Sequence, residues 1–410
     1  MTSKPALTQL QMVLTFSNGR TSPERAEKAF VSVFGANGVI GKSVIANSPG
    51  NTIIIGRVGS YCGSVHFSKD ACWVSDNAIR ATAKGDNDPR FLYYLLKQLN
   101  LNNWRSGSGQ PLLNQSTLNA IEAPIPSPIQ QRAISGIAGA IDDRISLLHE
   151  TNVTLEAIAQ ALFKSWFVDF DPVRAKVEGR APEGMDEATA ALFPDGFDES
   201  ELGPVPMGWR VSTLSHAFEV NPKRSLKKAS MASYLDMASL ATSGHCVESP
   251  IQREVGSGAK FCNGDTLLAR ITPCLENGKT AFVDFLADSE IAWGSTEFVV
   301  LHPKAPLPEY FGYLLCRHQP FREYAINSMS GTSGRQRIQN DVLGLYPLVI
   351  PDSAIASAFR EAIEPIQRSI AANHRMAQTL ASLRDTLLPR LISGQLGIPE
   401  AETQIEAIAA

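Results

Sequence analysis

The chain contains two copies of one long apolar pattern, separated by a constant offset of 225 residues. Both copies step alternately by four and three residues, which is the seam of a helix that packs along another helix. Because the period is far longer than that of a solenoid repeat, the pattern indicates a duplicated unit of domain plus helix. The first copy is Ile134, Ala138, Ile141, Ile145, Leu148, Asn152, Leu155, Ala159, Leu162 and Trp166, and the second is Phe359, Ile363, Ile366, Ile370, Asn373, Ala377, Leu380, Arg384, Leu387 and Leu391.

Three seam positions are polar. Asn152 and Asn373 occupy the same place in the two copies, where a buried asparagine can fix the register of a helix pair. The alternative is an asparagine that faces solvent at a splayed end. Arg384 either extends its charged end to water or faces a partner.

A chain of 410 residues is too long for one ordinary hydrophobic core. We expect an α+β protein in which two strand-rich domains are each followed by a long helix. The predicted parts are a first domain at 1–126, a helix at 127–170, an acidic connector at 171–208, a second domain at 209–351, a second helix at 352–394 and a frayed tail at 395–410.

The first domain carries the stronger local patterns. Strands are expected at 30–34 and 39–45 around the hairpin turn Ala36-Asn37-Gly38, then at 52–58, 64–67 and 71–83, followed by a helix from Pro89 to Leu99. The second domain repeats this order. Residues 266–271 match 52–58, Trp293 to Glu297 match Trp73 to Asn77, and the glycine loop at 330–334 matches that at 106–109.

The two long helices follow proline-bounded segments, with Ser127 and Asp352 as N-caps. The first is expected to run to about Phe167. The second is expected to reach about Leu388, with a kink or a local loss of helix at Pro365.

Positive charge is concentrated in the domains, although the whole chain has a net charge of −4. Residues 1–126 carry net +5 and residues 209–351 net +1, whereas the connector carries net −6. A local basic surface can bind phosphates despite an acidic total, with ordinary charge scatter as the alternative. The cysteines are scattered without a CxxC pair, and no segment resembles a membrane span or an export signal, so a cytoplasmic protein without a zinc site is expected.

Candidate DNA contacts lie in loops. Lys223, Arg224, Lys227 and Lys228 form a tight cluster suited to phosphates, with a merely solvated loop as the alternative. Arginine, asparagine and glutamine residues around the glycine loops suit base edges. Arg57 and Arg270 recur at one place in both domains, which is also consistent with a shared ion pair. The remaining candidates are Lys42, Arg105, Gln110, Asn114, Arg335, Gln336, Arg337 and Gln339.

Two motifs suggest enzymes and fail on inspection. Residues 35–43 resemble a phosphate-binding P-loop, but its first glycine falls one residue too early and the segment reads as a hairpin. The same glycines superficially resemble those of S-adenosylmethionine enzymes, yet no Asn/Asp-Pro-Pro-aromatic tetrapeptide follows. We assign no catalytic residue, metal ligand or bound cofactor to this chain.

Four segments resemble the specificity (S) subunits of type I restriction–modification systems. Residues 34–41 resemble the first-domain hairpin of that family, and residues 162–173 resemble the end of its central helix. Residues 203–209 resemble the start of its second recognition domain, and residues 387–394 resemble its C-terminal end. One departure is the absence of a Pro-x-x-Trp start to the first domain, which leaves the role of residues 1–30 open.

The resemblance implies two target recognition domains, each reading half of a split DNA site. It also implies that the two helices pack antiparallel as a coiled-coil spacer with pseudo-two-fold symmetry. The helices would dock two methyltransferase (M) subunits, which use S-adenosylmethionine to methylate adenine N6. Restriction (R) subunits would use ATP and Mg²⁺, in a bacterial or archaeal cytoplasm at the nucleoid. A diverged methyltransferase and a helical scaffold without a DNA role are the alternatives.

Overall fold

The computed structural model describes residues 5–26, 28–106, 111–332 and 334–409. The chain divides into two units. Unit 1 consists of Met1–Ser146 and Gln378–Ala410, and unit 2 is Leu147–Ala377. The division cuts both long helices, so each unit holds a strand-rich domain together with a part of each helix. The sequence pattern, by contrast, predicts domains and helices as consecutive segments of the chain.

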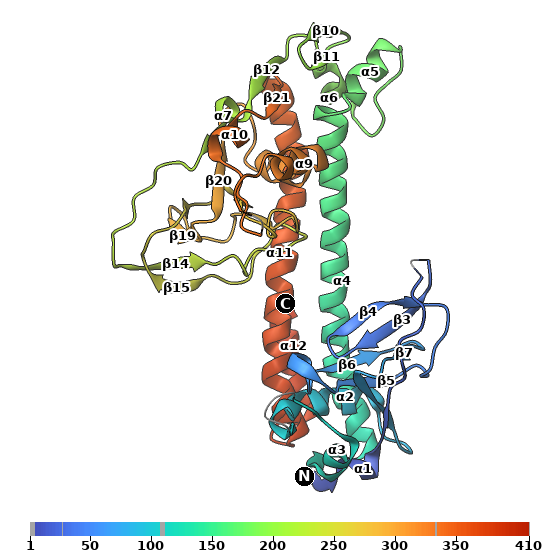
Figure 1. Ribbon diagram of the computed structural model, residues 1–410. Helices are drawn as coiled ribbons and strands as arrows, with labels where there is room; N and C mark the ends of the chain where they lie inside the picture. Colours follow the sequence, from blue (N-terminus) through green and yellow to red (C-terminus); the bar gives the residue numbers. More distant parts are fainter. Residues whose placement is uncertain (1–4, 27, 107–110, 333, 410) are drawn as a thin grey trace. The chain divides into compact units, whose positions relative to one another are not determined.

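The strand-rich part of unit 1 begins with a pair of end strands and contains two further sheets. β1 pairs with β9, and the antiparallel sheet has the order β2-β8-β5-β6. The smaller sheet has the order β4-β3-β7, with β3 parallel to β7 (Figure 1). The bounds are β1 Ala6–Gln9, α1 Leu10–Val13, β2 Leu14–Asn18, β3 Val31–Gly35, β4 Gly38–Ser43, β5 Thr52–Gly56, η1 Gly59–Tyr61, β6 Val65–Ser68, β7 Trp73–Val74, β8 Ala78–Ala83, α2 Pro89–Gln98, η2 Leu101–Trp104, α3 Gln115–Ala120 and β9 Glu122–Ile125.

The strand-rich part of unit 2 repeats this topology, with one more strand, β16, in the smaller sheet. β12 pairs with β21, the antiparallel sheet has the order β13-β20-β17-β18, and β14 is parallel to β19 in the sheet β15-β14-β19-β16. The bounds are β12 Arg210–Thr213, α7 Leu214–Ala217, β13 Phe218–Val220, β14 Met231–Leu235, β15 Ile251–Glu254, β16 Lys260–Phe261, β17 Thr266–Ala269, β18 Thr280–Phe282, β19 Ala292–Gly294, β20 Phe298–Pro303, α8 Phe311–Arg317, α9 Gln319–Asn327, α10 Asn340–Gly344 and β21 Pro347–Ile350.

The start of the first domain was not recognised in the sequence, and the structure supplies it. β1, α1 and β2 at residues 6–18 have the same order and pairing as β12, α7 and β13. Leu10 and Leu214 are fully buried at the start of the short helix in each copy. Residues 6–18 therefore complete the first domain without the Pro-x-x-Trp signature.

The predicted strand at 71–83 is wrong in one respect, because it is two strands. β7 belongs to the small sheet and β8 to the large one, and the chain turns between them where the Ser75 N–H bonds to the Phe34 carbonyl at 2.9 Å. The predicted hairpin is confirmed, since β3 and β4 pair with Gly35 opposite Gly38.

The long helices are α4, Pro128–Phe167, and α11, Ser353–Ile392. Both predicted N-caps are confirmed. Asp352 accepts the N–H groups of Ala354 and Ile355 at 2.9 and 3.0 Å, and Ser127 forms reciprocal bonds with Gln130. The helix α11 is continuous through Pro365 and ends four residues later than predicted. A proline removes one backbone hydrogen bond, and buried seam residues on either side, Ile363 and Ile370, hold the helix in place.

The predicted helix pairing occurs within each unit. In unit 2, Asn373 Nδ2 donates to Asn152 Oδ1 at 2.9 Å, Asn152 Nδ2 donates to the Ile370 carbonyl at 3.1 Å, and Trp166 lies against Phe359, so the segments run antiparallel (Figure 1). In unit 1, Ile134 packs with Leu387 and Leu391 in one core. Arg384 bonds to Asp142 and Asp385, so it faces carboxylates of its own chain.

Two segments expected to be irregular contain regular structure. The connector holds α5 Asp171–Val177, α6 Glu187–Leu192 and an antiparallel pair of β10 Phe197–Ser200 and β11 Gly203–Pro206. The tail forms α12, Ile398–Ala409, with Ala401 fully buried in the core of unit 1. The apolar positions of α12 are too few to predict a helix from the sequence. The helix is stabilised instead by its contact with the core of unit 1.

Candidate nucleic-acid interface

The second glycine loop is held by backbone hydrogen bonds at the end of β17. Arg270 follows that strand, its N–H bonds to the Glu297 carbonyl and its carbonyl accepts the Ile338 N–H, both at 3.0 Å. Ser330 and Arg337 exchange backbone bonds across the base of the loop at 2.9 and 3.0 Å. This frame fixes where side chains on the loop can reach.

An ion pair braces the same loop from the side. Arg337 Nε and Nη2 donate to both carboxylate oxygens of Glu297, at 2.6 to 3.0 Å. These hydrogen bonds hold the pKa of Glu297 below its ordinary value. The Arg337 side chain is 39% exposed, so a predicted DNA contact lies at the surface but already has a carboxylate partner.

A basic groove lies beside this loop. It has a volume of about 420 Å³ and is lined by Lys223, Arg224, Lys260 and Arg270. Arg270 Nη2 also donates to Gln339 Oε1 at 3.3 Å, which connects the groove to the loop. The structure thus brings together candidates that are far apart in the sequence. Lys260 was missed, because only the pairing of β16 with β19 brings it here.

The four-residue basic cluster separates into two kinds of side chain. Arg224 Nη2 bonds to Asp265 at 2.7 Å, its side chain is 12% exposed, and Asp265 is fully buried. Burial raises the pKa of Asp265, and the contact with Arg224 opposes that shift. Lys223, Lys227 and Lys228 are more accessible and remain the better candidates for phosphate contacts.

Unit 1 builds the equivalent frame with different side chains. The Arg57 N–H bonds to the Asn77 carbonyl at 2.9 Å and the Arg57 carbonyl accepts the Leu113 N–H at 3.0 Å. Leu112 and Ser106 exchange backbone bonds as Arg337 and Ser330 do. In unit 1, Asn77 and Leu112 occupy the places of Glu297 and Arg337, so this ion pair is found in unit 2 and has no equivalent at that place in unit 1. What Arg57 and Arg270 share is therefore their backbone hydrogen bonds.

The other candidates are distributed around these frames. Asn114 caps α3, accepting the Thr117 N–H at 2.8 Å, so its oxygen is occupied. Gln336 is partly buried and its N–H bonds to Thr272. Lys42, Arg105 and Arg335 are exposed. Gln110 lies outside the described residues.

Comparisons with known proteins agree with this organisation. A family model described as the type I restriction modification DNA specificity domain matches residues 8–157. The specificity subunit of the type I restriction enzyme MjaIX from Methanocaldococcus jannaschii is 26% identical over 330 residues, covering 76% of this chain and 69% of that protein. The specificity subunit of HindI from Haemophilus influenzae is 24% identical over 372 residues, covering 75% and 77%. Residues 8–157 therefore match the type I restriction–modification DNA specificity domain, and the chain as a whole is similar to type I specificity subunits.

The fold of the chain also matches a solved structure. The S subunit of the type I restriction–modification system from M. genitalium superposes with a TM-score of 0.57 at 16% identity, covering 94% of this chain and 95% of that one. At that identity the match concerns the fold alone.

Specificity subunits are not themselves catalytic and bind no cofactor of their own. The geometry of the apparent P-loop is consistent with this, because residues 35–43 form the β3–β4 hairpin and are not followed by a helix. Within the described ranges, no group of His, Cys, Asp and Glu side chains is placed to hold a metal ion, and no helix is long and apolar enough to cross a membrane.

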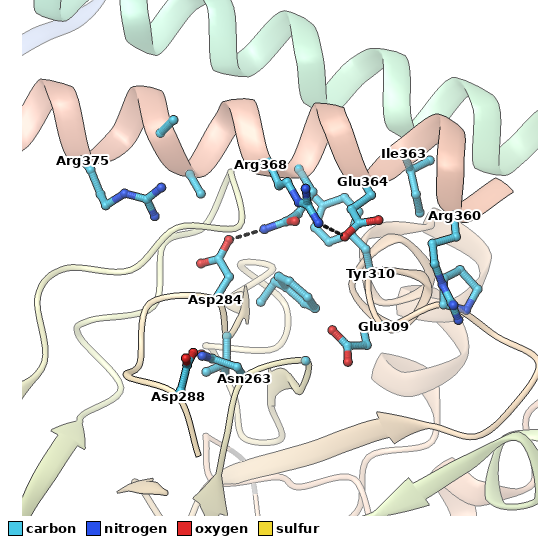
Figure 2. Close-up of a pocket in the computed structure, with 17 residues that line it drawn as sticks. Asn263, Asp284, Asp288, Glu309, Tyr310, Arg360, Ile363, Glu364, Arg368 and Arg375 are labelled. Carbon is cyan, nitrogen blue, oxygen red and sulfur yellow. Dashed lines mark hydrogen bonds and ion pairs between the residues drawn. The ribbon is translucent and has the colours of Figure 1, made fainter. Parts of the chain in front are cut away.

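A larger cleft in unit 2 is separate from the basic groove. It has a volume of about 900 Å³ and lies along α11, with Arg360 and Arg368 on the helix and Asp284, Asp288 and Glu309 on the facing loops (Figure 2). Gln367 donates to Asp284, and Arg368 pairs with Glu364. Because its walls carry both signs of charge, and because none of the sequence candidates for DNA contact lines it, we do not include it in the nucleic-acid interface.

Proposed function

We propose that this chain reads a split DNA target, with residues 1–126 at one half-site and residues 209–351 at the other. The observation that supports this most directly is the repeated frame: in both units an arginine after a buried strand is bonded to the base of a glycine loop. A loop fixed on a rigid sheet is a suitable place for base readout, because its side chains are held in a defined position.

The candidate side chains divide into two expected roles. Lys223, Lys227, Lys228 and Lys260 would contact phosphates, which contribute affinity without sequence information. Arg335, Gln336 and Gln339 on the second loop would contact base edges, with Arg57 and Arg105 as the corresponding cations in unit 1.

The proposal extends to the assembly. The two long helices would serve as the spacer between half-sites and dock two M subunits, which supply S-adenosylmethionine and adenine N6 methylation. R subunits would supply ATP-driven cleavage. The seam side chains pack inside the chain, so docking falls to exposed helix residues such as Leu147, Val153 and Ile158, which are 50%, 70% and 45% exposed.

Genome-wide mapping of methylated adenine tests the proposal. Cells that supply the M subunit are compared with and without this chain. A split motif that requires the chain is expected, and it would give both half-sites and their spacing. If the M subunit is active and bound yet no such motif arises, a scaffold role becomes the better interpretation. Saturable binding of ATP or S-adenosylmethionine to the isolated chain would instead favour an enzyme.

A charge test addresses the basic loop itself. Lys227→Ala with Lys228→Ala removes two exposed cations, so the slope of log affinity against log salt should become shallower by about 0.9 for each phosphate that is no longer neutralised. An unchanged affinity and slope would remove this loop from the interface.

A further inference from the structure

Unit 1 exposes two large aromatic side chains in short helical turns near the base of its glycine loop. Tyr61, the last residue of η1, is 51% exposed, and Trp104, the last residue of η2, is 44% exposed. Single exposed aromatic residues are common and need no explanation. The two turns, however, are built against each other and against the base of the loop.

The contact between the turns depends on a glycine. Gly63 has φ +89°, and a Cβ at this position would lie 2.4 Å from Asn102 Oδ1 and 2.6 Å from the Asn102 nitrogen. A side chain here would prevent η2 from approaching the turn after η1 so closely. Tyr61 and Trp104 are therefore carried by two turns in direct backbone contact.

The same turns support the base of the loop and its arginines. The Gly59 N–H bonds to the Pro111 carbonyl at 3.3 Å, and Val58 bridges Leu112. Between the aromatic turns lies Cys62, whose thiol donates to the Arg57 carbonyl at 3.3 Å. Burial raises the pKa of this thiol, and the charge of Arg105 opposes that shift.

This combination of groups is suited to a nucleic acid. Aromatic rings pack on the deoxyribose of a duplex, while the neighbouring arginines reach toward base edges. We propose that Tyr61 and Trp104 form an aromatic platform on which the DNA of one half-site packs. The inference rests on the proposed function and adds to it a contact that does not depend on charge.

Within the described part of unit 2, no such platform lies at the equivalent position. Ile271 and Ser330 make the backbone bridges that Val58 and Ser106 make in unit 1. Counting from them, Cys274 stands where Tyr61 stands, and Ser328, followed by Met329, stands where Trp104 stands. Met329 packs against the core of unit 2. The platform should therefore affect recognition of one half-site and leave the other unaffected.

The test uses the full chain assembled with its M subunit and a fluorescein-labelled duplex carrying the split motif from the methylation map. Trp104→Ala and Tyr61→Ala are each expected to weaken binding about tenfold, with no change in salt slope. Trp104→Phe should recover most of the affinity. Phe30→Ala is the matched control, because Phe30 is 93% exposed in the same unit but lies outside the platform, so binding should be unaffected.

Two further measurements keep the outcomes separate. Tryptophan emission should change on DNA binding in the wild type and change less in Trp104→Phe, because Trp104 is one of five tryptophans. Wild-type affinity in the Tyr61→Ala, Trp104→Ala double variant, or a weakening explained by a changed salt slope, overturns the platform. A wild-type complex that does not distinguish the motif from scrambled DNA overturns the proposed function itself.

Discussion

Arg224 and Lys223 are adjacent in sequence, yet their surroundings in the folded chain differ. The Arg224 guanidinium is almost enclosed and pairs with a buried carboxylate, whereas Lys223 is more accessible. A basic cluster in a sequence therefore mixes groups that are accessible to a partner with groups that stabilise the loop. Two members of the cluster, Lys223 and Arg224, line the basic groove, but only the burial of Asp265 reveals which member is structural.

Arg224→Ala should destabilise the folded chain by about 3 kcal/mol, because it leaves the buried carboxylate of Asp265 without its guanidinium partner. Urea unfolding measures this effect. Lys223→Ala is the control and should keep the wild-type stability while making the salt slope of DNA binding shallower. Equal stability of both variants would contradict the structural role of Arg224.

Glu297→Gln should strengthen DNA binding and steepen its salt slope. The substitution preserves size but removes the negative charge that neutralises Arg337, so the guanidinium becomes available to a phosphate. Fluorescence anisotropy at several salt concentrations gives both quantities. A weaker complex would instead mean that the ion pair acts mainly by holding the loop in place.

At the scale of elements, the long helices were the most predictable part of the chain. Their seam depends on a period that side chains must follow wherever two helices pack, so burial of Ile134 and Leu387 followed from the sequence alone. Short elements were less predictable. The two-residue strand β7 and the four-residue helix α1 depend on partners far away in the chain, and no local pattern encodes those contacts.

The paired asparagines offer an element-scale test. Asn152→Leu should cost about 1–2 kcal/mol, because it leaves the Asn373 amide without its partner inside the helix seam. Replacing both residues by leucine should recover that stability, because a leucine pair suits an apolar seam. A double-mutant cycle in urea measures the coupling, and additive effects would show that the two amides do not depend on each other.

At the scale of the whole molecule, three partly buried histidines link stability to pH. Burial lowers the pKa values of His66, His318 and His374 from the ordinary value of 6.5. Below that value the unfolded chain binds more protons than the folded chain, so the free energy of unfolding must fall as the pH drops. Asp143, with a pKa of about 2, titrates well below this range.

The thermal midpoint should therefore fall between about pH 7 and pH 5. Scanning calorimetry across this range measures the fall. Replacing His66, His318 and His374 together by asparagine should flatten the profile, even if it lowers stability at neutral pH. A midpoint that is independent of pH in the wild type would contradict the assignment.

Unit 1 is built from two separate stretches of chain, and this has a consequence for its biosynthesis. Leu387, Leu391 and Leu396 are buried in its core, yet the ribosome makes them only after all of residues 147–377. The domain whose strands are translated first must therefore wait, with part of its apolar surface uncovered, while unit 2 is already complete. A stop codon at residue 378 would leave all of unit 2 in place and would remove the part of the unit 1 core that comes from the end of the chain.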